Sequence, residues 1–128
     1  MFHLSTLPSD QPRLVRDIAS ELKIPSPFLS KIVQVLARRG LILSQKGPGG
    51  GVTLGRPADQ ISLLEVVGVI DGLDLTRDCV LGLPDCGEGA PCPLHEHWGE
   101  IRDRIVTILE YQTIAGMGCE LENLGRAL

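Results

Sequence analysis

Residues 13–40, RLVRDIASELKIPSPFLSKIVQVLARRG, decide the fold of this 128-residue chain. The first part places Leu14, Ile18 and Leu22 at the spacing of one helical face. A second helical pattern follows the short link KIPS at residues 23–26. Two short helices joined by such a tight link are typical of a helix-turn-helix.

The second helix has recognisable ends. Ser26 is an expected N-cap, Pro27 suits the first helical position, and Gly40 suits the C-terminal stop. The apolar spacing predicts a buried stripe made of Phe28, Ile32, Val35 and Leu36. The polar residues that fall mainly on the other side are Ser30, Lys31, Gln34 and Arg38.

Two short β-type runs come next, at Leu41–Ser44 and Val52–Leu54, around a Gly/Pro-rich turn. They predict a hairpin with a long tip. Helix, turn, helix and a two-stranded wing is the order of a winged helix-turn-helix, in which the second helix enters the major groove of DNA. The GPGGG tip lacks the Lys-Ser/Thr pair and the following helix of a phosphate-binding loop.

Charge is unevenly distributed along the chain. Residues 1–57 carry a net charge of +5 and residues 58–128 carry −9, which together give −4. The basic half favours binding to a polyanion, and Lys31, Arg38 and Lys46 cluster on the predicted DNA-binding elements. Solvated helix faces would give the same pattern. The sequence shows no membrane span and no signal peptide, so we expect a cytoplasmic protein with reduced cysteines.

Residues 79–95, CVLGLPDCGEGAPCPLH, form a loop whose Gly and Pro content excludes a long regular element. Thiolates are the usual ligands of iron–sulphur clusters, and a histidine can replace a cysteine on one iron. Structural zinc, whose paired cysteine knuckles are absent, and a bare thiol switch are the alternatives. His95 could instead cap the next helix, His97 could substitute for it as a ligand, and Cys119 is expected to be a small packed residue.

The C-terminal half carries two more helical patterns. Ser62 and Glu65 form a capping-box pattern before a short helix that ends at Gly72, with Leu63, Val66, Val67 and Ile70 on one side. Residues 94–117 predict a long amphipathic helix. Its apolar stripe needs a partner, either a second copy of the chain or the chain itself. The stripe has one longer gap at Gln112 and contains Trp98, Ile101, Ile105, Ile108, Leu109 and Ile114.

The predicted fold is mainly α with a small β-wing: a winged helix-turn-helix domain plus a long C-terminal dimerisation helix. We divide it into a DNA-binding domain at residues 1–73, a cysteine-rich sensor loop at 74–95, and a dimerisation helix with its tail at 96–128.

These stretches together resemble the IscR/NsrR family (Rrf family) of winged-helix regulators. The resemblance covers residues 12–115, and its most specific parts are the GPGGG wing tip and the spaced cysteine triplet. It implies a homodimeric bacterial transcription regulator, often with an iron–sulphur cluster in the loop before the dimerisation helix.

By position, the resemblance implies that Cys79, Cys86, Cys92 and His95 are the cluster ligands. It implies that residues at the start of the second helix read the bases, and that a basic residue just before the wing tip contacts the DNA. The DNA-binding residues expected are Ser26, Pro27, Ser30, Lys31, Gln34, Arg38, Lys46, Gly49 and Gly50. Family members begin with a longer first helix, of which residues 1–7 look like the second half; a frayed apolar segment is the alternative.

We therefore expect a homodimeric regulator that binds double-stranded DNA and senses redox state, nitric oxide or iron through an iron–sulphur cluster, with 2Fe–2S favoured over 4Fe–4S. A regulator using zinc or a thiol switch, and a cluster-carrying interaction module that does not bind DNA, are the alternatives. An enzyme is not expected, because the chain lacks a paired acid–base constellation, a nucleophile elbow and a nucleotide loop.

Overall fold

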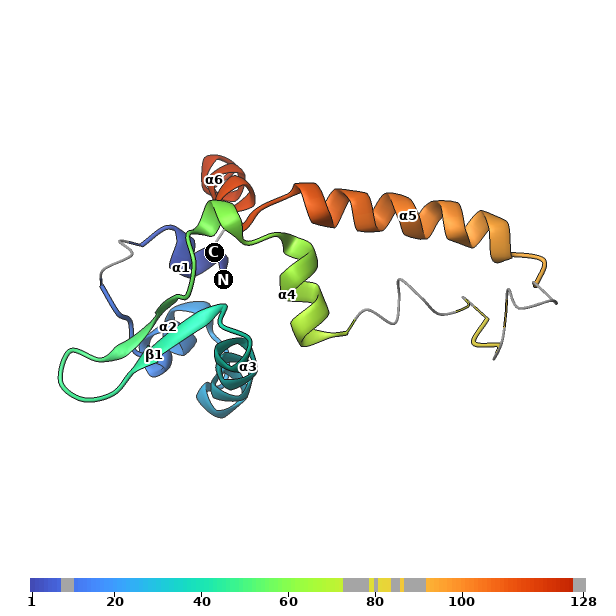
Figure 1. Ribbon diagram of the computed structural model, residues 1–128. Helices are drawn as coiled ribbons and strands as arrows, with labels where there is room; N and C mark the ends of the chain where they lie inside the picture. The colour runs from blue at the N-terminus through green and yellow to red at the C-terminus, as the bar shows by residue number, and fades with distance from the viewer. Residues whose placement is uncertain (8–10, 73–78, 80, 84–85, 87–91, 126–128) are drawn as a thin grey trace.

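The computed structural model describes residues 1–7, 11–72, 79, 81–83, 86 and 92–125. The fold is mainly helical, with one antiparallel sheet of two strands (Figure 1). The elements are α1 (Phe2–Ser5), α2 (Val15–Leu22), α3 (Ser26–Arg38), β1 (Ile42–Gln45), β2 (Gly51–Leu54), η1 (Ala58–Gln60), α4 (Leu63–Ile70), α5 (His95–Tyr111) and α6 (Ile114–Asn123).

Helices α2 and α3 form the predicted helix-turn-helix. Helix α2 is followed by its C-cap residue Lys23, whose backbone is left-handed (φ 56°) and whose amide donates to carbonyls of the last turn. Helix α3 begins one residue earlier than predicted, because extended Pro25 occupies the N-cap position and Ser26 is already helical. The prediction that Ser26 caps α3 is therefore wrong by one residue. Gly40, with φ 76°, follows the end of α3 as expected.

The buried face of α3 differs from the predicted stripe. Leu36 is buried, and Leu29, Ile32 and Val33 pack around the core. Phe28 and Val35 are instead 59% and 38% exposed, so their assignment to the buried stripe is wrong. Two overlapping apolar stripes run along this helix, and its packing against α2, α4 and β1 selects the stripe that includes Leu29 and Val33.

Strands β1 and β2 form the predicted wing. They pair antiparallel from Ile42 opposite Leu54 to Gln45 opposite Gly51. A further bridge joins Arg13 to Val52 through two backbone hydrogen bonds of 3.1 and 2.7 Å. This bridge fixes the wing to the start of α2, and buried Val52 anchors it in the core.

Gly55, just beyond the wing, provides a test of this packing. A Cβ at Gly55 would lie 2.0 Å from the carbonyl oxygen of Gly40. We expect Gly55→Ala to lower the free energy of unfolding by about 2–3 kcal/mol, because backbone must move to accommodate the methyl group. Gly99→Ala is the matched control: its Cβ would meet no atom closer than 3.9 Å, and alanine favours a helix. Urea titration measures both, and equal midpoints for Gly55→Ala and wild type would contradict the packing described.

Helix α4 begins with the predicted capping box. The Ser62 side chain accepts from the Glu65 amide, and the Glu65 carboxylate accepts from the Ser62 amide. Leu63, Val66 and Val69 pack around the core, whereas Ile70 is 42% exposed. The expected placement of Ile70 on the packed side is therefore wrong.

The Glu65 carboxylate also accepts a 2.7 Å bond from Arg56, and this bond holds the pKa of Glu65 below its usual 4.5. A depressed folded-state pKa stabilises the protein above pH 4.5, and this contribution is lost as the pH falls through the folded-state value. We expect the difference in Tm between wild type and Glu65→Gln to be present at pH 6 and to shrink by pH 3. The effect is small because the pair is partly exposed. A Tm difference between the two proteins that stays constant from pH 6 to pH 3 would contradict a stabilising role for the ionised Glu65 carboxylate.

The single long helix predicted over residues 94–117 is interrupted. Helix α5 ends at Tyr111, Gln112 is extended, and the Thr113 side chain caps α6 by accepting from Gly116. The Ile114 amide donates to the Ile61 carbonyl at 2.9 Å, and both isoleucine side chains are fully buried. This pairing returns the chain to the core, so Ile114 belongs to the core and not to the stripe of the long helix.

Helix α1 packs against α6 and β2, and its Leu4 is buried. A contact of 2.9 Å between His3 Nε2 and the Glu21 carboxylate connects it to α2. Residues 2–5 are therefore a packed helix, as the resemblance implied, and not a frayed segment. Within the described part of the chain, no helix has the length and apolar character needed to cross a bilayer.

Candidate metal centre and nucleic-acid interface

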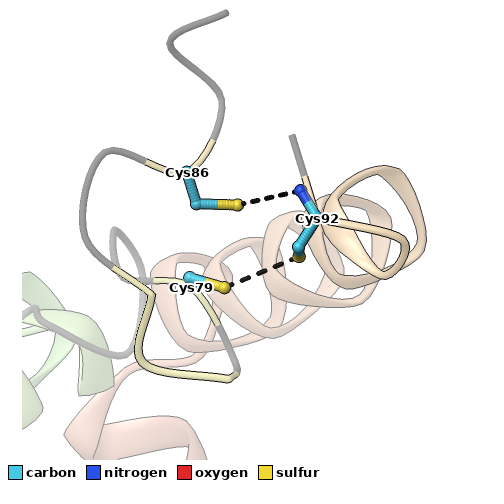
Figure 2. Close-up of side chains that lie close together, drawn as sticks. All are labelled: Cys79, Cys86 and Cys92. Carbon is cyan, nitrogen blue, oxygen red and sulfur yellow. Dashed lines mark hydrogen bonds between the residues drawn. The ribbon is translucent and has the colours of Figure 1, made fainter. Parts of the chain in front are cut away.

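Three cysteines converge beside the start of α5. Figure 2 shows the thiols of Cys79, Cys86 and Cys92 directed toward one another. Their Sγ atoms all lie within 4.8 Å of one another, and those of Cys79 and Cys92 are 3.6 Å apart. All three are half-buried. The rest of the loop predicted at 74–95 lies largely outside the described residues.

His95 lies next to this cluster at the first position of α5. Its Nδ1 is 3.4 Å from Cys86 Sγ, and its amide donates to the Cys92 carbonyl. Leu94 is the N-cap residue and His95 is already helical, so the alternative in which His95 is a capping residue is wrong. His97, the suggested substitute ligand, is exposed two positions further along.

The electrostatics of the three thiols differ. Hydrogen bonds from the backbone of Leu83 and then of Leu81 lower the pKa of Cys79 to about 7. Burial raises the pKa of Cys92, and its bond to Cys86 adds to this. The Cys92 amide also donates to Cys86 Sγ at 3.4 Å. Backbone amides therefore stabilise negative charge on sulphur, and the sequence pattern had not indicated this role of Leu81 and Leu83.

This donor set fits a metal group that prefers soft ligands. Three thiolates and an imidazole suit an iron–sulphur cluster or a zinc ion, and none of these donors favours magnesium or calcium. Cys119 lies elsewhere, exposed on α6 with Asn123 Nδ2 3.8 Å from its sulphur. The expectation that Cys119 is packed is therefore wrong, and it is not in the group of converging thiols.

The predicted DNA-binding residues lie on α3 and the wing. Those on α3 that are exposed are Pro27, Lys31, Gln34 and Arg38. Ser26 and Ser30 are half-buried and line an open groove of about 490 Å³ between α3, the start of α2 and the wing. Lys46 and Gly49 are exposed at the wing tip, and Gly50 lines the groove. Arg16 and Gln45 also line it, and sequence reasoning had missed both.

Residues 26–54, which include α3 and both strands of the wing, contain four basic residues and no acidic residue. This segment is the positive surface expected of a protein that neutralises phosphates.

Helix α5 extends away from the helix-turn-helix (Figure 1) and packs against α4. Trp98, Ile105 and Leu109 are half-buried. Ile101 is 50% exposed and Ile108 is 61% exposed, and Tyr111 adds a further exposed ring. The predicted stripe is therefore divided between a packed side and an exposed apolar side.

Comparison with known proteins identifies the family. The Rrf2 model, described as an iron-dependent transcriptional regulator, matches residues 1–120. A protein of Aquifex aeolicus whose name describes an HTH-type transcriptional regulator is 34% identical over 115 residues, which are 87% of this chain and 80% of that one.

The HTH-type transcriptional regulator IscR of Cronobacter sakazakii is 34% identical over 99 residues. These cover 77% of this chain and 60% of IscR, so the chain spans less than two thirds of that relative.

Among solved structures, CymR, the global cysteine regulator of B. subtilis, superposes with a TM-score of 0.79 at 24% identity and covers 93% of this chain and 87% of its own. This similarity confirms the winged-helix fold. With a family match over residues 1–120, the chain belongs to the Rrf2 family of DNA-binding transcriptional regulators.

Proposed function

We propose that this regulator binds operator DNA as a homodimer and senses a redox or iron-related signal through an iron–sulphur cluster held by Cys79, Cys86, Cys92 and His95. The observation that carries the proposal is the convergence of three thiols within 4.8 Å, with the His95 imidazole 3.4 Å from one of them. The match to a family described as iron-dependent supports an iron-containing group at this site.

The position of these ligands explains how the site could act on DNA binding. Cys92 and His95 lie at the start of α5, and Cys79 and Cys86 precede them in the chain beyond α4. When all four residues share one bound group, they fix the start of α5 relative to that segment. Helix α4 packs on α3, so this restraint is transmitted toward the DNA-binding surface. When bound, the cluster supplies a redox- and oxidant-sensitive centre.

The homodimer is supported by α5. Its exposed apolar side chains, Ile101, Ile108 and Tyr111, have a fractional exposure of 50% or more. A second copy of the chain would bury them, and a two-fold axis would then present two copies of α3 to successive half-sites of the operator.

Anaerobic purification, followed by a visible absorption spectrum and assays of iron, sulphide and zinc, tests the proposed cofactor. We expect broad visible absorbance with iron and sulphide in similar amounts. A colourless protein that contains zinc, or no metal at all, would contradict the cluster.

The second candidate function uses a zinc ion or a thiol switch in place of the cluster. The short distance between the Cys79 and Cys92 sulphurs favours it. A tetrahedral zinc ion with bonds of about 2.3 Å places its sulphurs about 3.8 Å apart, close to the 3.6 Å between Cys79 and Cys92. The metal assays separate zinc from a cluster. A metal-free protein whose free thiols decrease by two on mild oxidation would identify the thiol switch.

A further inference from the structure

Phe28 is an aromatic side chain that the core does not use. It lies in the first turn of α3 and is 59% exposed. The chain has only four aromatic residues, two of them phenylalanine. A single exposed apolar side chain is common on protein surfaces, so the position of Phe28 among the predicted DNA-binding residues, and not its exposure alone, indicates a ligand.

The neighbours of Phe28 indicate what kind of partner covers it. Exposed Pro27 and Lys31 flank it along the helix, and Arg38 follows on the same exposed side. The absence of acidic residues between positions 26 and 51 makes this surface complementary to a polyanion. In a helix-turn-helix, the N-terminal residues of the second helix contact base edges in the major groove. Phe28 occupies such a position.

We propose that Phe28 contacts the 5-methyl group of a thymine in each half-site and thereby specifies a T·A pair there. This methyl group is the apolar feature that base pairs present in the major groove, and phenylalanine is among the side chains that read it. The inference rests on the proposed binding of DNA through α3. What it adds is the identity of one base in each half-site. Phe28 would recognise that base through an apolar contact, because its side chain cannot form a hydrogen bond.

A second copy of the chain is the competing partner for Phe28. The stripe on α5 already offers an apolar surface for self-association, with Ile101 and Ile108 exposed. The surface around Phe28 is basic, so two copies meeting there would bring like charges together. DNA therefore fits this surface better.

The experiment begins with selection of a binding sequence from random duplex DNA by the full, anaerobically purified protein. Each thymine of the selected operator is then replaced by deoxyuridine, which removes only the methyl group. For wild type we expect one position in each half-site at which affinity falls about fourfold, the factor for one buried methyl group. Phe28→Ala should bind the unmodified operator more weakly and respond to no such replacement. Phe28→Leu should retain part of the response.

Val35→Ala is the matched control, because Val35 is an exposed apolar residue two turns further along α3. It should keep the wild-type response to deoxyuridine. A wild-type protein indifferent to every replacement, or a Phe28→Ala variant that keeps the response, would overturn the inference while leaving DNA binding intact. A change in the sedimentation mass of Phe28→Ala would also overturn it, by assigning Phe28 to a protein contact. Failure to select any sequence would instead contradict the proposed function.

Discussion

Replacing Cys92 with Ser is expected to lower the metal affinity at least about tenfold and so to reduce the metal bound after purification, because even outer-shell changes at metal sites cost 10–100-fold in affinity. Cys92 is central to the site in two ways. Its sulphur lies 3.6 Å from that of Cys79, and its amide donates to Cys86 Sγ (Figure 2). The serine hydroxyl is a harder, less acidic donor than a thiol and is a poor replacement for a thiolate ligand. Iron, sulphide and zinc assays on anaerobically purified protein measure the loss.

Cys119→Ser is the control for this substitution. It makes the same chemical change at an exposed cysteine on α6, outside the group of three converging thiols. We expect it to keep the full metal content and the same thermal unfolding. Equal metal content in the Cys92→Ser and Cys119→Ser variants would show that the three-cysteine group does not hold the metal.

Replacing Lys31 with Ala is expected to weaken operator binding at least tenfold and to do so on every sequence tested. Lys31 is exposed on α3, in a segment whose only charged residues are basic. Because the substitution removes one phosphate-binding charge from each half of a dimer, the slope of log affinity against log salt should fall by about 2. A fluorescence-anisotropy titration over a series of salt concentrations gives both quantities.

Arg104→Ala provides the matched comparison for Lys31→Ala. It removes one positive charge from an exposed position on α5, away from α3 and the wing. Because Arg104 shares the side of α5 that carries Ile101 and Ile108, the comparison uses the variant at a concentration where sedimentation shows the same mass as wild type. We expect this variant to keep the wild-type affinity and salt slope. The same loss in both variants would mean that net charge, and not the position on α3, governs binding.

Local signals in the sequence predicted the DNA-binding elements well. Gly40 after α3 and the capping box of Ser62 with Glu65 depend on residues close together in the chain, and the structure contains both. The hairpin follows from turn residues between two β-type runs, and the observed strands lie within one residue of those runs. Such features are determined by backbone preferences and short-range hydrogen bonds, so they can be read without the tertiary structure.

Features that depend on distant parts of the chain were not predictable in the same way. The break between α5 and α6 arises because Ile114 pairs with Ile61, 53 positions earlier, in the core. The helical pattern continued through this point and gave only a weak signal at Gln112. The buried side of α3 was misassigned for a related reason, since its partners decide which of two apolar stripes is covered.

The candidate metal centre lies between these cases. The spacing and chemistry of the cysteines indicated a metal or redox site, and the structure brings three of them together with His95. The unequal pKa values of Cys79 and Cys92 depend on which backbone amides reach each sulphur and on local burial. The cysteine positions alone contain no such information.

The central claim is that the occupancy of the site formed by Cys79, Cys86, Cys92 and His95 sets the affinity for operator DNA. One anaerobic experiment tests it most directly. The selected operator is titrated with protein as purified and, separately, with protein stripped of metal by a chelator, and the two affinities are compared. We predict that the two affinities of wild type differ at least fivefold, a typical lower value for coupling between two sites. We also predict that the affinity of Cys92→Ser is the same before and after treatment. Equal affinities for loaded and stripped wild-type protein would contradict the account.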